Sequence, residues 1–172
     1  MAMIETSREV GVVVRRRSID NPWIDQLWSP ALILDEVPST APWTALSTEA
    51  DATTYYAGSA SIELFSAETA NYRDNLAEGA PRIWVALRRQ DGGAELELTK
   101  VTADPTEGEA MFASGCDVIG TVPMPPEIAS WIAAFVDRFH VERLFHKRKR
   151  ERAASERPRV PGARPDEGTG RR

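Results

Sequence analysis

The clearest pattern of hydrophobic and polar positions lies near the C-terminal end of the chain. Six apolar residues lie at positions i, i+3, i+4, i+7, i+8 and i+11, which places them in one stripe along a helix. Pro125 and Pro126 come just before the stripe, and proline is tolerated in the first turn of a helix. The pattern predicts a long amphipathic C-terminal helix packed on a sheet, with an apolar face made of Ile128, Trp131, Ile132, Phe135, Val136 and Phe139.

Alternating apolar residues predict β-strands in two other regions. Three valines alternate within residues 10–14, in a segment that begins near Glu9. The clearest hairpin joins the alternating residues 83–87 to Leu96 and Leu98 across a Gly92-Gly93 turn. Polar residues at the intervening positions are typical of antiparallel sheets that bury one face. We therefore expect a mainly antiparallel β-sheet of about five to seven strands.

The segments between these regions are interpreted from their turn residues. Residues 27–37 predict a strand, in which Pro30 indicates an edge position or a bulge. Residues 53–57 and 60–66 predict a second hairpin around Gly58-Ser59.

Together these elements predict a single α+β domain over residues 9–150. The sheet is joined by one short central helix within residues 66–77 and by the long C-terminal helix. Residues 1–8 are predicted to be a flexible N-terminus. Residues 151–172 are rich in proline, glycine and basic residues and poor in apolar ones, so we expect a disordered tail.

The composition favours a soluble cytoplasmic protein. The single cysteine, Cys116, excludes an intramolecular disulfide and any cysteine-based metal cluster. The N-terminus lacks the apolar run of a signal peptide, and no segment has the roughly 18 apolar residues that a membrane-spanning helix needs. We therefore expect no membrane association.

Charge is distributed unevenly along the chain. Residues 138–172 contain 12 Lys and Arg against 5 Asp and Glu, a net charge of +7, whereas residues 1–137 carry −12. The basic part could bind an anionic partner, or fold back and screen its own acidic body. The run at residues 147–150 could neutralise phosphates, or complement the negative end of a helix dipole. A pI of about 5.2 argues against a dedicated nucleic-acid-binding protein.

Residue patterns typical of enzymes are missing from the sequence. Gly92-Gly93 lies in a predicted turn rather than in a phosphate-binding loop, and there is no Gly-x-Ser-x-Gly motif. His140 and His146 would lie about 120° apart around a helix, so they cannot hold one metal ion together. We expect no catalytic residue, metal or cofactor. Candidate partner-binding residues cluster instead after the apolar stripe, at Phe139, His140, Phe145, His146, Lys147, Arg148, Lys149 and Arg150.

A ligand site is the alternative to this partner surface. Four aromatic residues in the first third of the chain are candidates for such a site, namely Trp23, Trp28, Tyr55 and Tyr56. A concave pocket lined by these residues would indicate a ligand site. A flat sheet beside an uncovered apolar helix face would favour a protein partner.

Several short segments occur in an order that is specific as a set. They are residues 10–17, 20–23 with Trp28, 72–76, 82–89, 122–126, 135–140 and 145–150. Because it contains these segments in this order, the chain resembles a family of small proteobacterial proteins, domain of unknown function 3305, over roughly residues 10–152.

The resemblance implies a biological setting rather than a reaction. Members of the family are often encoded beside genes for molybdenum-dependent formate dehydrogenase and its accessory factors. Some members carry names that suggest molybdopterin-guanine dinucleotide synthesis, but this chain lacks the Gly-rich nucleotide-binding loop of such transferases. The family supplies no catalytic residues that could be transferred to this sequence.

We therefore expect a non-enzymatic accessory or binding protein that acts in the assembly or regulation of a molybdenum-dependent formate dehydrogenase. The expected partner is a protein, either a subunit of that enzyme or one of its maturation factors. Two alternatives remain open. One is an enzyme or carrier that acts on the molybdopterin cofactor, and the other is a regulator that contacts nucleic acid through residues 147–150.

Overall fold

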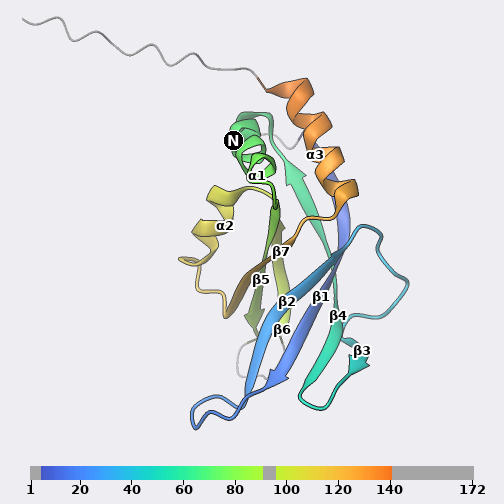
Figure 1. Ribbon diagram of the computed structural model, residues 1–172, viewed down its shortest axis with the longest axis vertical. Coiled ribbons are helices and arrows are strands. Elements are labelled where there is room, and N and C mark those ends of the chain that lie inside the picture. Colours follow the sequence, from blue (N-terminus) through green and yellow to red (C-terminus); the bar gives the residue numbers. More distant parts are fainter. Residues whose placement is uncertain (1–4, 91–95, 141–172) are drawn as a thin grey trace, which may run out of the picture. The chain divides into compact units, whose positions relative to one another are not determined.

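The computed structural model describes residues 5–90 and 96–140, which contain seven strands and three α-helices (Figure 1). An antiparallel four-stranded sheet has the order β2-β1-β4-β3. Its strands are β1 (Thr6–Ser18), β2 (Gln26–Leu34), β3 (Thr44–Thr48) and β4 (Ala52–Leu64). An antiparallel three-stranded sheet has the order β6-β5-β7. Its strands are β5 (Arg82–Arg89), β6 (Leu96–Thr102) and β7 (Val118–Pro123).

The predicted α+β fold with antiparallel strands is confirmed, but the expected single sheet is wrong. β4 lies beside β6 and β2 lies beside β7, yet no hydrogen-bonded ladder joins the two sheets within the described residues. Where β2 lies beside β7, Pro30 has no N–H that it could donate to a ladder between these strands. It also approaches β7 closely, because a Cβ added at Gly120 would lie 2.9 Å from the Pro30 Cδ atom.

The hydrophobic core lies between the two sheets. Alternate residues of β1, namely Val10, Val12 and Val14, are fully buried there. Ile83 and Leu87 of β5 belong to the same core, so one row of each central strand faces the other sheet. β1 begins at Thr6, earlier than the start predicted near Glu9.

The predicted hairpin around Gly58 is wrong, because β4 continues through this glycine. Val12 pairs with Gly58 and Val13 pairs with Tyr56, which leaves Ala57 as an extra residue in β4. Gly58 has a φ of +122°, so its conformational freedom serves a β-bulge rather than a turn. Pro30 was predicted to mark an edge strand or a bulge, and both are confirmed. β2 is an edge strand, and its pairing with β1 shifts beside this residue.

The predicted central helix is confirmed as a 3-10 turn, Ser66–Glu68, followed by α1 (Thr69–Ala77). Hydrogen bonds of Asn75 link α1 to the three-stranded sheet. Its amide nitrogen donates to the carbonyl oxygens of Arg82 and Ala103, both at 2.8 Å, and its amide oxygen accepts from the Arg82 N–H at 2.9 Å. A further short helix, α2 (Pro105–Met111), is capped by Asp104, whose side chain accepts from the first backbone N–H groups.

The C-terminal amphipathic helix is α3 (Pro126–Phe139), whose 14 residues bury Ile128, Ile132, Phe135 and Val136 in the core. It packs beside α1, where the rings of Phe135 and Tyr72 are 6.2 Å apart. The helix ends at Phe139 because His140 has extended backbone angles. The described residues therefore do not support the expected long helix, and residues 141–150 lie outside them. None of the described helices has the length and apolar character needed to cross a membrane.

The described residues all belong to one compact unit. The predicted tail at residues 151–172 lies outside the described part of the chain.

Candidate functional site

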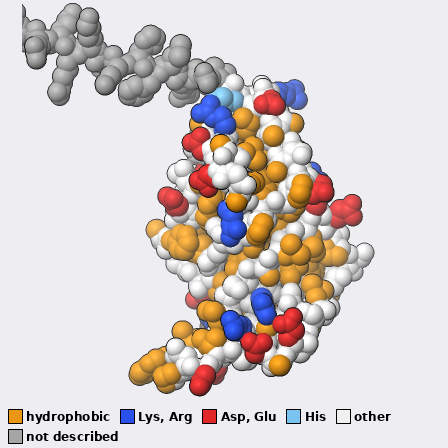
Figure 2. Space-filling model, viewed as in Figure 1, with side chains coloured by type: hydrophobic (Ala, Val, Ile, Leu, Met, Phe, Trp, Pro, Cys, Tyr) orange, Lys and Arg blue, Asp and Glu red, His pale blue; other side chains and the backbone are white. Residues whose placement is uncertain are grey.

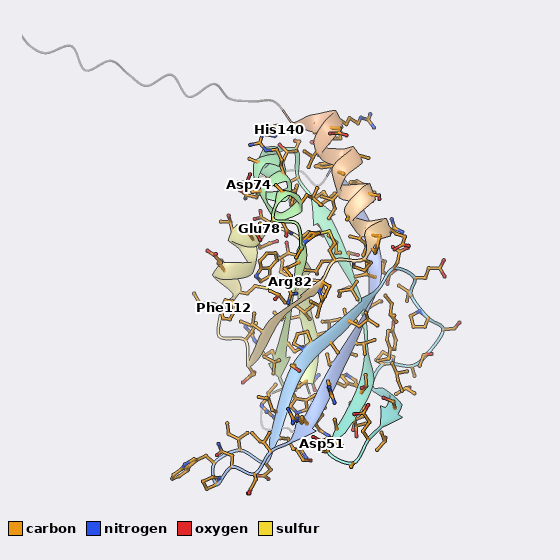
Figure 3. The ribbon with its side chains drawn as sticks, in the orientation of Figure 1. Asp51, Asp74, Glu78, Arg82, Phe112 and His140 are labelled. Atoms are coloured by element: carbon orange, nitrogen blue, oxygen red, sulfur yellow. The ribbon has the colours of Figure 1, made fainter. Side chains whose placement is uncertain are left out.

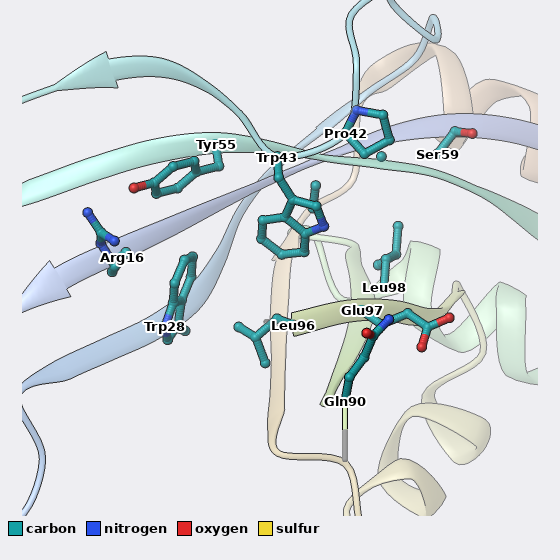
Figure 4. A pocket seen from close by; sticks show the side chains of 12 residues that line it. Arg16, Trp28, Pro42, Trp43, Tyr55, Ser59, Gln90, Leu96, Glu97 and Leu98 are labelled. Atoms are coloured by element: carbon teal, nitrogen blue, oxygen red, sulfur yellow. The ribbon is translucent and has the colours of Figure 1, made fainter. Parts of the chain in front are cut away.

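A pocket of about 640 Å³ opens between the two sheets (Figure 4). β1, β2 and β4 form one side of it, and the start of β6 forms another. Small-molecule sites usually measure about 300–1,000 Å³, so this pocket is large enough for a ligand of one to a few rings. The side chains that matter most for its chemistry are Arg16, Trp28, Trp43, Tyr55, Leu96 and Glu97.

Strand pairing explains why these side chains meet. Arg16 continues the row of core-facing residues on β1, because alternate residues of a strand share a face. Trp28 on β2 is the direct cross-strand partner of Arg16, and Tyr55 on β4 is the direct partner of Val14. Directly paired residues of antiparallel strands lie on the same face. Arg16, Trp28 and Tyr55 therefore all extend from one face of the sheet.

Three aromatic rings form a corner in the pocket. The ring centroids of Trp28 and Tyr55 are 5.6 Å apart with an interplanar angle of 39°. Trp43 stands almost perpendicular to Trp28, at 6.0 Å and 87°. Both distances lie in the range in which aromatic pairs attract one another. The corner presents indole and phenol surfaces that can stack on a flat ligand.

The guanidinium group of Arg16 lies over two of these rings. Its Cζ atom is 5.8 Å from the Trp28 centroid and 5.2 Å from the Tyr55 centroid. The neighbouring arginines point to the other face of the sheet, where Arg15 pairs with Glu49 at 3.1 Å and Arg17 with Asp51 at 3.2 Å. The Arg16 side chain, by contrast, forms no hydrogen bond or ion pair with any described residue.

Trp43 reaches the pocket from a strained backbone. Its φ of +67° is the only positive value among the described residues that are not glycine. For a bulky residue this left-handed conformation costs about 1–3 kcal/mol and persists only where the surroundings enforce it. Here the Trp43 N–H donates to the Tyr56 carbonyl oxygen, and the Thr44 hydroxyl donates to the Ala41 carbonyl oxygen at 2.7 Å. These hydrogen bonds hold the Trp43 backbone in its left-handed conformation, and this conformation directs the indole into the pocket.

Polar side chains lie on the opposite side of the pocket. Figure 4 shows Glu97 and Gln90 across the pocket from Arg16, with Leu96 between the two sides. In the described segments, neither the Glu97 carboxylate nor the Gln90 amide has a hydrogen-bonding partner. Glu97 is exposed between the core-facing Leu96 and Leu98, and its carboxylate points away from Arg16 in Figure 4, so the pocket has a cation at one side, an amide at the other and apolar surfaces between them.

The two tyrosines with shifted pKa values lie outside this pocket. Burial raises the pKa of Tyr72 to about 12, and its hydroxyl accepts from the Phe65 N–H at 3.2 Å in the core. Burial and the nearby Glu9 raise the pKa of Tyr56. Neither group is placed for proton transfer in the pocket. Among residues 5–90 and 96–140, no three His, Cys, Asp or Glu side chains gather in a way that could hold a metal ion.

Of the predicted partner-binding residues, His140 links the end of α3 to α1, whereas the Phe139 ring packs against Phe135 within α3 itself. The Phe139 ring lies 4.7 Å from Phe135. The ring nitrogens of His140 lie 3.0 Å from the Thr69 hydroxyl and 2.9 Å from an Arg73 nitrogen, which places His140 beside α1 (Figure 3). The other six predicted residues lie outside the described part of the chain, and they are Phe145, His146, Lys147, Arg148, Lys149 and Arg150.

The aromatic residues considered for a ligand site divide into three groups. Trp28 and Tyr55 line the pocket. Tyr56 is buried on the other face of the sheet and is 2% exposed. Trp23 is 88% exposed on the connection between β1 and β2, where apolar side chains project in Figure 2. Sequence reasoning missed Arg16, although an arginine that continues an alternating apolar row was a usable signal.

The fold and the site define a small α+β protein with an aromatic pocket of ligand size. The chain belongs to the family described as protein of unknown function, DUF3305, whose sequence profile matches residues 9–149. The family predicted from the sequence is thus confirmed. No curated protein and no solved structure matches the chain.

Proposed function

We propose that the protein is a non-enzymatic binding protein and that it serves as an accessory factor of a molybdenum-dependent formate dehydrogenase. The observation that supports binding is the pocket, where the rings of Trp28 and Tyr55 flank a guanidinium group that has no hydrogen-bonding partner among the described residues. The setting comes from the family resemblance described above. In this proposal the pocket holds a ligand, and the segment after α3 contacts the enzyme or one of its maturation factors.

The pocket lining favours binding over catalysis. Arginine is poorly suited to general acid or base catalysis, because a guanidinium group does not readily release a proton in proteins. Glu97 is exposed, and no other acidic or histidine side chain lines the pocket with it among the described residues. Acid–base and nucleophilic catalysis require paired groups within hydrogen-bonding distance. The lining instead offers groups that orient and retain a ligand.

Capture of partners from the native host tests the accessory role. We expect the tagged full-length chain to retain subunits of formate dehydrogenase or a cofactor-insertion factor. Reversing the charge of Lys147, Arg148, Lys149 and Arg150 to Glu should abolish this capture, whereas Arg171→Glu with Arg172→Glu should not. A clean preparation that contains none of these proteins would contradict the proposal.

A carrier of the molybdopterin cofactor is the second candidate, and the same pocket favours it. Its volume and its stacking surfaces suit a ligand with fused rings. Calorimetric titration with the purified cofactor should then give saturable binding at one site. Absence of heat over the titration removes this candidate and leaves the partner capture unaffected.

A further inference from the structure

We propose, on the basis of the binding function proposed above, that the pocket takes a planar aromatic ring that carries an oxyanion, and that Arg16 holds this oxyanion. Carboxylate and phosphate share the required chemistry, because both present planar or tripodal oxygens to the fork of N–H groups on a guanidinium. The inference is carried by the position of Arg16, by the aromatic corner and by the charges around the pocket.

The contacts of Arg16 leave its hydrogen-bonding groups available. Its guanidinium lies over the rings of Trp28 and Tyr55, at 5.8 and 5.2 Å from their centroids. Stacking of this kind uses the flat face of the guanidinium and leaves the N–H groups at its edge free to donate. Arg15 and Arg17 on the same strand each donate to a carboxylate within 3.2 Å. An oxyanion on the ligand would give Arg16 the partner that its neighbours already have.

The charges around Arg16 determine the sign of the ligand. A cationic ligand would be repelled by Arg16, which is the one basic side chain in the lining described. Arg16 is also partly buried, and a charge-assisted hydrogen bond strengthens where water is partly excluded. The Gln90 side chain lies on the opposite side of the pocket, where its amide oxygen can accept from an N–H group on the far edge of the ligand (Figure 4).

The aromatic corner determines the shape of the ligand. Trp28 and Trp43 are nearly perpendicular, at 87°. A flat ring that stacks on one indole therefore meets the other edge to face, and both arrangements are favourable. A saturated ring of equal volume can make neither contact to full extent. The strained backbone of Trp43 holds its indole in place before the ligand arrives, which lowers the ordering cost of binding.

Calorimetry with a matched set of probes tests this inference on the full-length chain. The probes are 2-naphthoate, 2-naphthyl phosphate, the neutral alcohol 2-naphthalenemethanol and the saturated acid decahydro-2-naphthoate. We expect at least one aromatic oxyanion to bind about tenfold or more tightly than the alcohol and the saturated acid, since one charge-assisted hydrogen bond supplies a factor of this size. The tighter of the two aromatic probes identifies carboxylate or phosphate as the natural oxyanion.

Variants of neighbouring arginines assign the effect to one side chain. Arg16→Gln should remove the preference for the acid, about tenfold, while affinity for the alcohol stays the same. Arg15→Gln, on the other face of the same strand, should leave both affinities unchanged. If Arg16→Gln does not fold, as judged by circular dichroism, Arg16→Lys replaces it and should reduce the preference without abolishing it.

Three results would overturn the inference: no probe binds, the aromatic acids bind no better than the alcohol, or Arg15→Gln acts as strongly as Arg16→Gln. The partner-capture experiment separates these failures from failure of the proposed function. Capture of formate dehydrogenase proteins without probe binding rejects the ligand class alone. Probe binding without capture rejects the accessory role and leaves the ligand class in place.

Discussion

Two parts of one face of β1 have opposite environments. Val10, Val12 and Val14 are sealed in the core, whereas Arg16, the next residue in the same row, lines an open pocket. α3 lies near the beginning of the strand, where the Arg8 guanidinium is 6.0 Å from the Trp131 ring. At the Arg16 end the rings of Trp28 and Tyr55 border the pocket instead.

This difference teaches that alternation predicts which side of a strand faces inward but not whether anything covers it. A guanidinium cannot be buried without a partner except at a cost of several kcal/mol. Of the two arginines that end the apolar row, Arg8 pairs with Asp35, whereas Arg16 lies at the point where the sealed core gives way to an accessible cavity. In this chain the same point marks the candidate ligand site.

The largest effect we expect comes from placing a charge in the sealed middle of the row. Val12→Asp should destabilise the fold by about 4 kcal/mol or more, because the carboxylate would be buried without a partner. Arg16→Gln should change the free energy of unfolding by no more than about 1 kcal/mol, the size of the lost cation–π contacts. Urea unfolding followed by circular dichroism measures both. Equal losses of unfolding free energy in the two variants would contradict the account, because they would show that Arg16 is as inaccessible to water as Val12.

A smaller effect concerns Tyr72, which lies in the core beneath α3 and is 1% exposed. Burial raises its pKa to about 12 from the ordinary value of 10.0, so above pH 10 the unfolded chain loses this proton before the folded chain does. Stability should therefore fall by about 2–3 kcal/mol as the pH rises from 10 toward 12. The measurement is the free energy of unfolding across this range. Tyr72→Phe should flatten this part of the profile, and an unchanged slope in that variant would contradict the assignment.

An effect of about 1 kcal/mol tests the strain at the pocket end. At most positions glycine is less stable than alanine, but the φ of +67° at position 43 should reverse this order. We expect Trp43→Gly to be more stable than Trp43→Ala by about 1 kcal/mol, measured by urea unfolding. The two variants lack the same indole, so their difference reports the backbone alone. The ordinary order, with alanine more stable, would show that the positive φ is not retained.

The smallest effect should come from the outer face of β1. Arg15→Gln and Arg17→Gln each remove one exposed ion pair, with Glu49 or Asp51, and exposed pairs contribute at most about 1 kcal/mol. Thermal unfolding of both variants at low and high salt checks this. A large, salt-dependent loss of stability would mean that these arginines do more than interact with single surface carboxylates.

Much of the fold could be predicted from local patterns. The valines of β1, the alternation in β5 and the apolar stripe of α3 each mark an element that buries one face. The division into two sheets could not be predicted, because strand order depends on contacts between segments that are distant in the sequence. The predicted hairpin at Gly58 failed for a local reason. Glycine serves turns and bulges equally well, and only the pairing with β1 distinguishes them.

The candidate site was harder to predict for the same reason. A bulge reverses the alternation of a strand, so Tyr55 and Ile62 share the inward face of β4 although their spacing is odd. A second shift in β2 places Trp28 and Ile33 together in the same way. Simple alternation across these strands therefore misassigns one side of each bulge. Trp43 offered no signal at all, since no residue pattern announces a tryptophan with positive φ.

The central claim is that the aromatic pocket binds a ligand, and nuclear magnetic resonance of the tryptophan indole N–H groups tests it most directly. The chain has five tryptophans, of which Trp28 and Trp43 line the pocket and Trp23 is 88% exposed elsewhere. Titration with the tighter-binding of 2-naphthoate and 2-naphthyl phosphate should shift the Trp28 and Trp43 signals to saturation and leave Trp23 unchanged. Signals that do not move, or a Trp23 signal that moves together with them, would contradict the claim.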